Sequence, residues 1–321
     1  MRPVTNDVVV FSGAAHPEFA EEMCGLLGVE LSPTRVQRFS NDCVQVQLRA
    51  NCRQRDVYIV QPLVPPTQEN LVELLMMVDA ARGASAAHVN VVMPHYAYAR
   101  SDKKDAPRIS VGGRLVADLL ATAGATRVLT MALHSEQVHG FFSVPVDHLT
   151  ALPVLADHYR GRDLSNTVVV SPDFGNAKDA GRFARALGVE VAAGSKQRKG
   201  DDTVVIDAIV GDVAGKDCIV LDDEIATGGS IVTLIDALCD YGVNSISVAT
   251  THGLFTGNAV ERLGAVEAID EIVTTNTVPQ DKPVEKLRVL SVAPLFAEAV
   301  RRIHLGESVS TLFSEENTYG E

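Results

Sequence analysis

The feature that most restricts the fold of this chain is its alternation of short apolar segments with longer helical ones. Buried strands are predicted for residues 8–11, 57–60, 89–93, 128–133, 168–170 and 219–221. Helices are predicted between them, at 68–83, 113–123 and 230–241. Strands that are apolar on both faces are typical of parallel sheets covered by helices on both sides. The alternation therefore predicts an α/β protein. Residues 71–78 are apolar almost all round, so that helix is expected deep in a core or against another subunit.

The chain also shows a faint internal echo. Gly pairs open predicted helices at Gly112-Gly113 and Gly228-Gly229, a spacing of 228 − 112 = 116 residues. In both places a Gly closes the helix and a His follows: Gly124 and His134, and Gly242 and His252. The echo predicts two copies of one α/β unit, although α/β proteins often look self-similar. A length of 321 residues fits two domains, 1–150 and 151–321, and the last residues could pack back on the first.

Charge and composition exclude several classes of protein. The formal charge is 28 − 41 = −13, which argues against a broad nucleic-acid-binding surface but not against small phosphorylated ligands. No apolar run approaches the roughly 18–20 residues of a membrane span, and the first residues resemble no signal peptide. The five cysteines are dispersed, without a Cys-x-x-Cys pair, so a zinc or disulfide framework is not expected. Such cysteine usage predicts a cytoplasmic location.

The strongest local signal lies at residues 218–230. A buried strand is expected to end in Asp222-Asp223, and Thr227-Gly228-Gly229-Ser230 then leads into a helix. Such a turn offers backbone N–H groups and hydroxyls to a phosphate, and the paired carboxylates suit sugar hydroxyls or Mg²⁺. The alternative is simple helix capping, which needs only one such residue.

Three further candidates have ordinary structural explanations when read alone. His134 stands just past a predicted strand, where a His is more often a hydrogen-bonded structural residue. Asp173 follows another strand and could be a helix cap. The run 194–200 contains Lys196, Arg198 and Lys199 between two glycines and could be a solvated loop. The chain has neither a Walker loop nor a Gly-x-Gly-x-x-Gly motif.

Taken together, these motifs resemble the ribose-phosphate pyrophosphokinase family over nearly the whole chain. The runs that carry the resemblance are 11–13, 70–75, 98–103, 133–137, 140–142, 171–175, 222–230 and 308–313. The resemblance implies two similar type I phosphoribosyltransferase-like domains, each a parallel sheet flanked by helices. It implies transfer of the diphosphate of ATP to the anomeric hydroxyl of ribose 5-phosphate. It also implies Mg²⁺ as cofactor and a homo-oligomer built from dimers or a hexamer, with the active site between the domains.

The resemblance assigns roles to residues of this chain. Lys196 and Arg198 are expected to stabilise charge during transfer, and His134 and Asp173 to hold Mg²⁺. Ribose 5-phosphate is expected at Asp222, Asp223, Thr227, Gly228, Gly229 and Ser230. ATP is expected at Phe39, Asn41, Cys43, Arg100, Ser101 and Lys103. A regulatory phosphate is expected at Asn51, Arg53, Ser308 and Ser310.

The chain departs from the family pattern at several of these positions. Residues 39–43 replace the family's Phe-Ser-Asp-Gly-Glu, so selectivity for adenine is expected to relax. Ala226 stands where Asp is usual, Gln197 where Arg is usual, and Asn176 where Gly is usual. Asn tolerates left-handed geometry better than most residues, so the turn at Asn176 is expected to survive. These departures leave two alternatives open: a weakly active regulatory paralogue, and a phosphoribosyltransferase that acts on a nucleobase.

Overall fold

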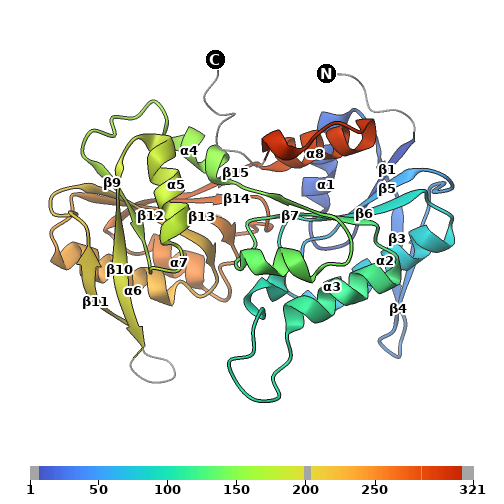
Figure 1. The fold of residues 1–321 in the computed structure, drawn as a ribbon, viewed down its shortest axis with the longest axis horizontal. Coiled ribbons are helices and arrows are strands. Elements are labelled where there is room, and N and C mark those ends of the chain that lie inside the picture. Colours follow the sequence, from blue (N-terminus) through green and yellow to red (C-terminus); the bar gives the residue numbers. More distant parts are fainter. Residues whose placement is uncertain (1–6, 199–203, 283, 313–321) are drawn as a thin grey trace. The chain divides into compact units, whose positions relative to one another are not determined.

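The computed structural model describes residues 7–198, 204–282 and 284–312 (Figure 1). Residues 1–6, Lys199, Gly200 and Phe313, which entered the sequence predictions, lie outside the described residues. The chain divides into two compact units, each with its own sheet. Unit 1 comprises Met1–Thr150, Thr277–Pro279 and Val292–Glu321, and unit 2 comprises Ala151–Asn276 and Gln280–Ser291.

Unit 1 contains a six-stranded parallel sheet in the order β2-β1-β5-β6-β7-β8. The strands are β1 (Val8–Ser12), β2 (Leu31–Ser32), β5 (Asp56–Val60), β6 (His88–Met93), β7 (Arg127–Met131) and β8 (Val146–Leu149). A separate antiparallel hairpin consists of β3 (Thr34–Arg38) and β4 (Val44–Leu48). The helices are α1 (Pro17–Leu27), α2 (Thr67–Gly83), α3 (Gly112–Ala123), α8 (Ala293–Leu305) and the short η1 (Ala97–Arg100), η2 (Glu136–Phe141) and η3 (Ser310–Leu312).

Unit 2 contains a seven-stranded sheet in the order β11-β10-β9-β12-β13-β14-β15, in which only the β10–β11 pair is antiparallel. The strands are β9 (Thr167–Ser171), β10 (Glu190–Arg198), β11 (Val204–Val210), β12 (Asp217–Ile225), β13 (Ser245–Gly253), β14 (Ile269–Thr275) and β15 (Leu287–Leu290). The helices are α4 (Leu152–Tyr159), α5 (Ala177–Leu187), α6 (Gly229–Asp240) and α7 (Ala259–Gly264). The predicted strands and helices are thus confirmed, and so is the α/β class.

Each sheet is buried on both faces, which explains its apolar strands. In unit 1, α2 and α3 pack on one face, while α1 and α8 pack together on the other (Figure 1). In unit 2, α6 and α7 share one core with the sheet, and α4 and α5 share another. Helix α2 is not buried all round, because Val72 is 45% and Met76 37% exposed. The expectation that residues 71–78 lie deep in the core is therefore wrong for the face that carries these two side chains. Among the described residues, no helix combines the length and apolarity needed to cross a membrane.

Apart from the additional antiparallel strand β11, the two sheets have the same strand order, but the repeat is not the one predicted. Strand β1 pairs with β5 at Val8 and Asp56, and β9 pairs with β12 at Thr167 and Asp217. The offsets are 167 − 8 = 159 and 217 − 56 = 161, so the repeat is near 160 residues. The predicted spacing of 116 is therefore wrong, because it matched α3 with α6, whose counterpart in the sheet order is α2. The error arose because helix–glycine–strand patterns recur at every α/β step.

The last helix of the chain belongs to unit 1. Phe296 of α8 packs edge-on against Phe19 of α1, with ring centroids 5.5 Å apart. At the end of α8, His304 Nδ1 lies 2.7 Å from one oxygen of Asp56, and His88 Nδ1 lies 2.7 Å from the other. Burial alone would raise the pKa of Asp56, but the bonds to His88 and His304 outweigh it and hold that pKa below its usual value. The carboxylate therefore ties α8 to the beginning of β5 and β6.

We expect Asp56→Asn to destabilise unit 1 by about 1–3 kcal/mol, because hydrogen bonds to a charged group are lost. The folded-state pKa of Asp56 is lowered, so its contribution is present above the ordinary carboxyl pKa, near 4, and is lost as pH falls through the folded-state value. Urea unfolding followed by circular dichroism measures this in a chain without Trp. The control Asp79→Asn breaks an exposed pair with Arg82 and should change stability by less than about 0.5 kcal/mol. Equal losses in the two variants would contradict the assignment.

Candidate active site

The candidate site of unit 2 lies at the reversal point of the strand order, where successive strands are added to the sheet in opposite directions. Strands β9 and β12 are neighbours, yet the chain continues from β9 to β10 on one side and from β12 to β13 on the other. In open α/β sheets, ligands bind beside the carboxyl ends of the strands at such a reversal. Residues 172–176 follow β9 here, and residues 226–228 follow β12. Every unit 2 residue expected to bind metal or ribose 5-phosphate belongs to these strand ends, these loops or the first two residues of α6 (Gly229–Asp240).

The paired carboxylates lie within β12, which is longer than predicted. Asp222 pairs with Thr250 and Glu224 with His252, so the predicted strand end at Asp222-Asp223 is two residues too early, and the strand runs on to Ile225. The strand continues because β13 offers partners as far as Gly253. Asp222 and Asp223 are half-buried, and the N–H of Asp223 donates to Asp222 Oδ1 at 3.0 Å.

The electrostatics of these carboxylates favour a cation or hydroxyl donors. The pKa of Asp222 is raised well above its usual value, first by burial and then by the charges of Asp223 and Asp173. Thr250, opposite Asp222, keeps a buried hydroxyl without a hydrogen-bond partner among the described residues. The donor set of clustered carboxylates fits Mg²⁺, which prefers oxygen ligands and retains waters or phosphate oxygens. The described residues contain no group of three or more His, Cys, Asp or Glu able to enclose a metal by itself.

The turn after β12 presents backbone N–H groups at a helix start. Gly228 adopts φ 71° and ψ 2°, a left-handed conformation that favours glycine, and α6 begins at the next residue. A Cβ at Gly228 would also lie 3.2 Å from Leu263. Thr227 and Gly229 are exposed, and Arg262 donates to the Thr227 carbonyl. The helix cap residue is Gly228, which has no side chain, so simple capping does not explain this cluster.

Asp173 shapes the loop after β9. Its Oδ1 accepts the N–H groups of Gly175 at 2.9 Å and Asn176 at 3.2 Å, and Asn176 is the cap residue of α5. The carboxylate therefore organises the loop and does not cap the helix. Asn176 has φ −92°, so this position needs no left-handed geometry. Its Nδ2 donates to the Leu221 carbonyl at 2.9 Å, which ties the loop to β12. This link was missed because the sequence shows no pairing signal between positions 45 residues apart.

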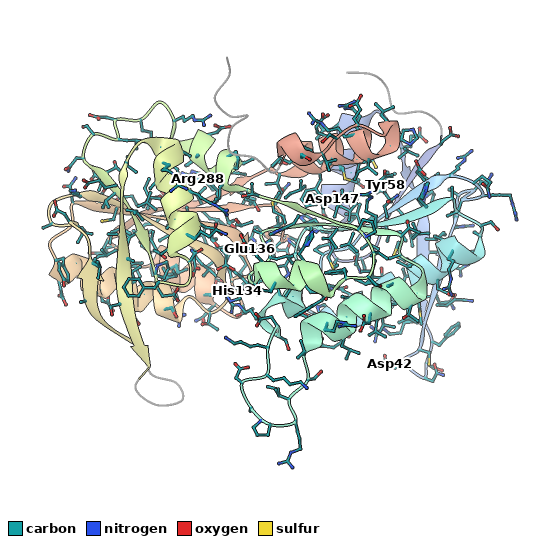
Figure 2. All side chains as sticks on the ribbon, viewed as in Figure 1. Asp42, Tyr58, His134, Glu136, Asp147 and Arg288 are labelled. Carbon is teal, nitrogen blue, oxygen red and sulfur yellow. The ribbon has the colours of Figure 1, made fainter. Side chains whose placement is uncertain are left out.

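In unit 1, His134 lies on the segment that follows β7 (Figure 2), and two polar contacts hold that segment. His134 itself is exposed. The N–H of Leu133 donates to His148 Nε2 at 2.8 Å, and burial lowers the pKa of His148 to about 4, so that ring is a neutral acceptor. Ser135 donates to Asp102 Oδ2 at 2.7 Å. The segment of His134 is thereby joined to the loop that follows η1, and neither Asp102 nor Ser135 was singled out from the sequence.

Three residues of that loop were expected to bind nucleotide. Arg100 and Lys103 are exposed beside the Asp102 link. Ser101 instead shapes the start of α3: its Oγ accepts the N–H of Gly112 at 2.8 Å, and its carbonyl accepts the N–H of Gly113 at 2.9 Å. A structural role therefore accounts for Ser101 without a ligand.

Phe39, Asn41 and Cys43 lie together at the tip of the β3–β4 hairpin. Phe39 is 44% exposed, and its N–H donates to the Cys43 carbonyl at 2.8 Å. Asn41 Oδ1 accepts the N–H of Cys43 at 3.2 Å, so the carbonyl acceptor of this residue, which is expected to bind ATP, is engaged within the turn. At the base of the tip, Arg38 pairs with Asp42 and Glu69.

Lys196 and Arg198 belong to a strand. In β10 they pair with Ile206 and Val204 of β11, and the register shifts between Ser195 and Lys196. The predicted loop is therefore wrong for residues 194–198, because β11 returns antiparallel and supplies ladder partners. The remaining residues of that prediction, Lys199 and Gly200, are among those outside the described chain.

The four expected regulatory residues form two local pairs. Asn51 Oδ1 accepts the N–H of Arg53 at 3.1 Å, and Ser308 Oγ lies 3.2 Å from Ser310 Oγ. None of the hydrogen bonds among the described residues joins one pair to the other.

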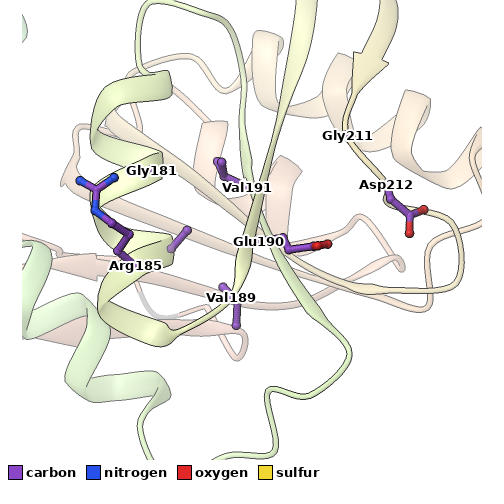
Figure 3. Close-up of a pocket in the computed structure, with 8 residues that line it drawn as sticks. Gly181, Arg185, Val189, Glu190, Val191, Gly211 and Asp212 are labelled. Atoms are coloured by element: carbon purple, nitrogen blue, oxygen red, sulfur yellow. The ribbon is translucent and has the colours of Figure 1, made fainter.

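A separate hollow of about 460 Å³ lies at the other end of the unit 2 sheet, where β10 begins (Figure 3). Arg185, Val191 and Asp212 line it, far along the strands from the carboxylates.

Comparisons with known proteins cover nearly the whole chain. A family model described as the N-terminal domain of ribose phosphate pyrophosphokinase matches residues 8–124, and one described as a phosphoribosyl synthetase-associated domain matches residues 205–314. A Streptomyces coelicolor protein named "Putative ribose-phosphate pyrophosphokinase" is 66% identical over 96% of this chain and 98% of its own. The ribose-phosphate pyrophosphokinase of Deinococcus radiodurans is 48% identical, with the same coverage. The crystal structure of phosphoribosylpyrophosphate synthetase from Mycobacterium smegmatis has a TM-score of 0.87 and 37% identity, covering 94% of this chain and 100% of that one.

We expect Asp222→Asn to stabilise the protein when no divalent cation is present. The substitution removes a buried charge that faces Asp223 and Asp173, and functional sites commonly sacrifice stability in this way. A rise of roughly 2–5 °C in the melting temperature at neutral pH, in chelator, would follow. Asp236→Asn, an exposed change on α6, is the matched control and should leave the melting temperature unchanged. An unchanged or lower value for the Asp222 variant would count against the repulsion.

Proposed function

This chain belongs to the ribose-phosphate pyrophosphokinase family, and from that premise we propose how its residues perform the reaction. It is a ribose-phosphate diphosphokinase that makes 5-phosphoribosyl 1-diphosphate. We take ATP and ribose 5-phosphate as substrates and AMP as the second product. The observation that carries the proposal is the reversal point of unit 2, where clustered carboxylates and a glycine turn meet.

Ribose 5-phosphate binds along the end of β12. Asp222 and Asp223 accept hydrogen bonds from the sugar hydroxyls, because ionised carboxylates are pure acceptors. The 5-phosphate takes backbone N–H groups of Thr227, Gly228, Gly229 and Ser230 and gains from the dipole of the twelve-residue helix α6. Ala226 adds no acceptor beside this turn, so weaker sugar-phosphate binding than with Asp is expected there.

Mg²⁺ binding is proposed at one residue of each unit, Asp173 after β9 and His134 after β7. His134 and Asp173 are the residues proposed to hold it, and the bound ion would neutralise phosphate charge and orient the diphosphate. Both loops are braced in the structure, that of His134 through His148 and Asp102, and that of Asp173 through Asn176. Bracing keeps such ligands close to a productive geometry.

Nucleotide binds to residues of the hairpin tip and the loop after η1. Phe39 has an exposed ring for stacking on a base, and Arg100 and Lys103 carry charge toward phosphates. The engaged acceptor of Asn41 and the weak acceptor of Cys43 support relaxed selectivity among nucleobases. Ser101 contributes by fixing the loop.

The transfer itself needs positioning and charge stabilisation. The anomeric oxygen attacks the β-phosphorus of ATP in line, the bond from that phosphorus to the α,β-bridging oxygen breaks, and AMP leaves with that oxygen. The anomeric hydroxyl gives up its proton to water as it attacks. Lys196 and Arg198 of β10 neutralise the charge that develops on the moving diphosphate, and no covalent nucleophile is required.

We expect the purified protein to release AMP from ATP only when ribose 5-phosphate and Mg²⁺ are both present. Lys196→Ala should lower kcat roughly 10²–10³-fold, the usual effect of removing one charge-stabilising donor, with less effect on ribose 5-phosphate binding. Lys216→Ala is the control, because Lys216 pairs on the surface with Glu190. The assay is repeated with each common nucleoside triphosphate, which measures donor selectivity. No monophosphate from any donor would favour the regulatory paralogue, and a requirement for a nucleobase would favour the phosphoribosyltransferase.

We also propose that the chain forms a homo-oligomer through unit 1. Helix α2 exposes Val72 and Met76, and α3 exposes Leu115 (53%) and Leu119 (38%), in each case four residues apart. The ion pairs Arg82–Asp79 and Arg114–Asp118 balance the charge on these helices, which lets a second copy approach although each chain has a net charge of −13.

The cytoplasmic location inferred from the dispersed cysteines stays a prediction.

We expect Leu115→Glu with Leu119→Glu to reduce the particle mass measured by light scattering, because a charged face opposes apolar contact. Leu26→Glu alters an equally exposed leucine of α1 (46%) and should leave the mass unchanged. A wild-type protein with the mass of one chain would contradict the proposal.

A further inference from the structure

Unit 1 has a counterpart of the unit 2 site, at the carboxyl ends of β1 and β5. The offsets of 159 and 161 residues superpose the strand pairing, so Ser12 corresponds to Ser171 (12 + 159) and Gln61 to Asp222 (61 + 161). The chain reverses direction at β1 and β5 as it does at β9 and β12. Both loops also bond the same carbonyl position: Gly13 N donates to Val60 O, and Asn176 Nδ2 donates to Leu221 O.

The turn that follows β5 cannot bind a phosphate as its counterpart does. Pro62, Pro65 and Pro66 have no N–H group to donate. Leu63 and Val64 are buried, at 0% and 4% exposure. By the offset of 161, these two residues correspond to Glu224 and Ile225, whereas Thr227, the first residue of the phosphate turn of unit 2, corresponds to Pro66, so unit 1 lacks the N–H group at that position.

Two buried polar side chains fill the remaining space. Gln61 is 0% and Glu73 7% exposed. Gln61 Oε1 accepts the N–H of Ala15 at 3.0 Å, and Glu73 Oε1 accepts the N–H of Ala14 at 2.7 Å. A Cβ on Gly13 would lie 2.4 Å from Gln61 Oε1, which shows how closely the glutamine approaches the loop.

The chemistry of this contact is that of an anion site with its ligand built in. Successive N–H groups between a strand and a helix attract phosphates and carboxylates. Here the N–H groups of Ala14 and Ala15 meet a protein carboxyl and an amide oxygen. Burial raises the pKa of Glu73, and the bond from Ala14 opposes that rise. No described contact gives Glu73 a role in the transfer reaction.

We propose that Glu73 is a positioning residue whose carboxylate takes the place of an anionic ligand and, with Gln61, holds residues 13–16 closed over the unit 1 counterpart of the sugar-phosphate site. Each chain then binds ribose 5-phosphate in unit 2 alone. The inference rests on the proposed ribose 5-phosphate site of unit 2. Its tests use no substrate, so a failure here is distinct from a failure of that proposal.

The first test shortens the side chain. Glu73→Asp withdraws the carboxylate by one methylene from Ala14 N, and we expect amide hydrogen exchange in residues 13–16 to accelerate at least tenfold. Glu69→Asp, one turn earlier and exposed, is the matched control and should leave that exchange unchanged. Unchanged exchange in the Glu73 variant, or equal acceleration in both, would overturn the proposal.

The second test supplies the missing group from solution. In Glu73→Ala, we expect acetate to slow the exchange of the same amides at least threefold relative to chloride at equal ionic strength. Wild-type protein and Glu69→Ala should show no acetate effect, and Glu73→Gln should need none because its amide oxygen can still accept. A merely structural loss would not respond to acetate, so absence of rescue would overturn the proposal. If Glu73→Ala does not fold, the exchange rates of Glu73→Asp decide the matter.

Discussion

The chemistry of this protein depends on one constraint of parallel sheets: neighbouring strands must end at the same edge. Both faces of each sheet are covered by helices, so polar groups on the strands are costly except at that edge. The reversal between β9 and β12 leaves space there, because their following loops diverge to opposite sides. The pairing of β9 with β12 brings the Asp222–Asp223 pair and the Asp173 loop together at this point.

The same constraint sets the electrostatics. Carboxylates gathered at a half-buried edge repel one another, and the raised pKa of Asp222 records that cost. Hydrogen bonds confined to the loops offset part of it, since Asp173 Oδ1 is held by two backbone N–H groups. A site assembled in this way is stable enough to persist and is still short of positive charge. A metal ion or cationic side chains brought to the site would supply the missing positive charge, and sugar hydroxyls would donate hydrogen bonds to the carboxylates.

Periodicity predicted the strands and helices because burial on both faces leaves an unmistakable apolar run, as in 168–170 and 219–221. It could not predict that β12 continues beyond Asp222 and Asp223 to Ile225, because that continuation depends on pairing with β13. The predicted loop at 194–198 failed for the same reason, since β11 supplies the ladder. The residues of the candidate site came from motifs and family resemblance. Their braces, such as Asn176 with Leu221 or Ser135 with Asp102, depend on contacts between distant positions that a single sequence does not encode visibly.

The two units carry side chains of opposite chemical character at equivalent positions of a similar backbone. At equivalent strand ends, unit 2 carries carboxylates followed by glycines, and unit 1 carries Gln61 followed by prolines. Glycine leaves N–H groups bare for a ligand, whereas proline removes them. The residues of unit 1 that we propose to hold Mg²⁺ and the nucleotide phosphates lie farther along its sheet, after β6 and β7, where Asp102 and Ser135 link the two loops. The two units therefore offer equivalent sheet edges, and the proposed phosphate site is confined to the edge whose turn carries glycines and not prolines.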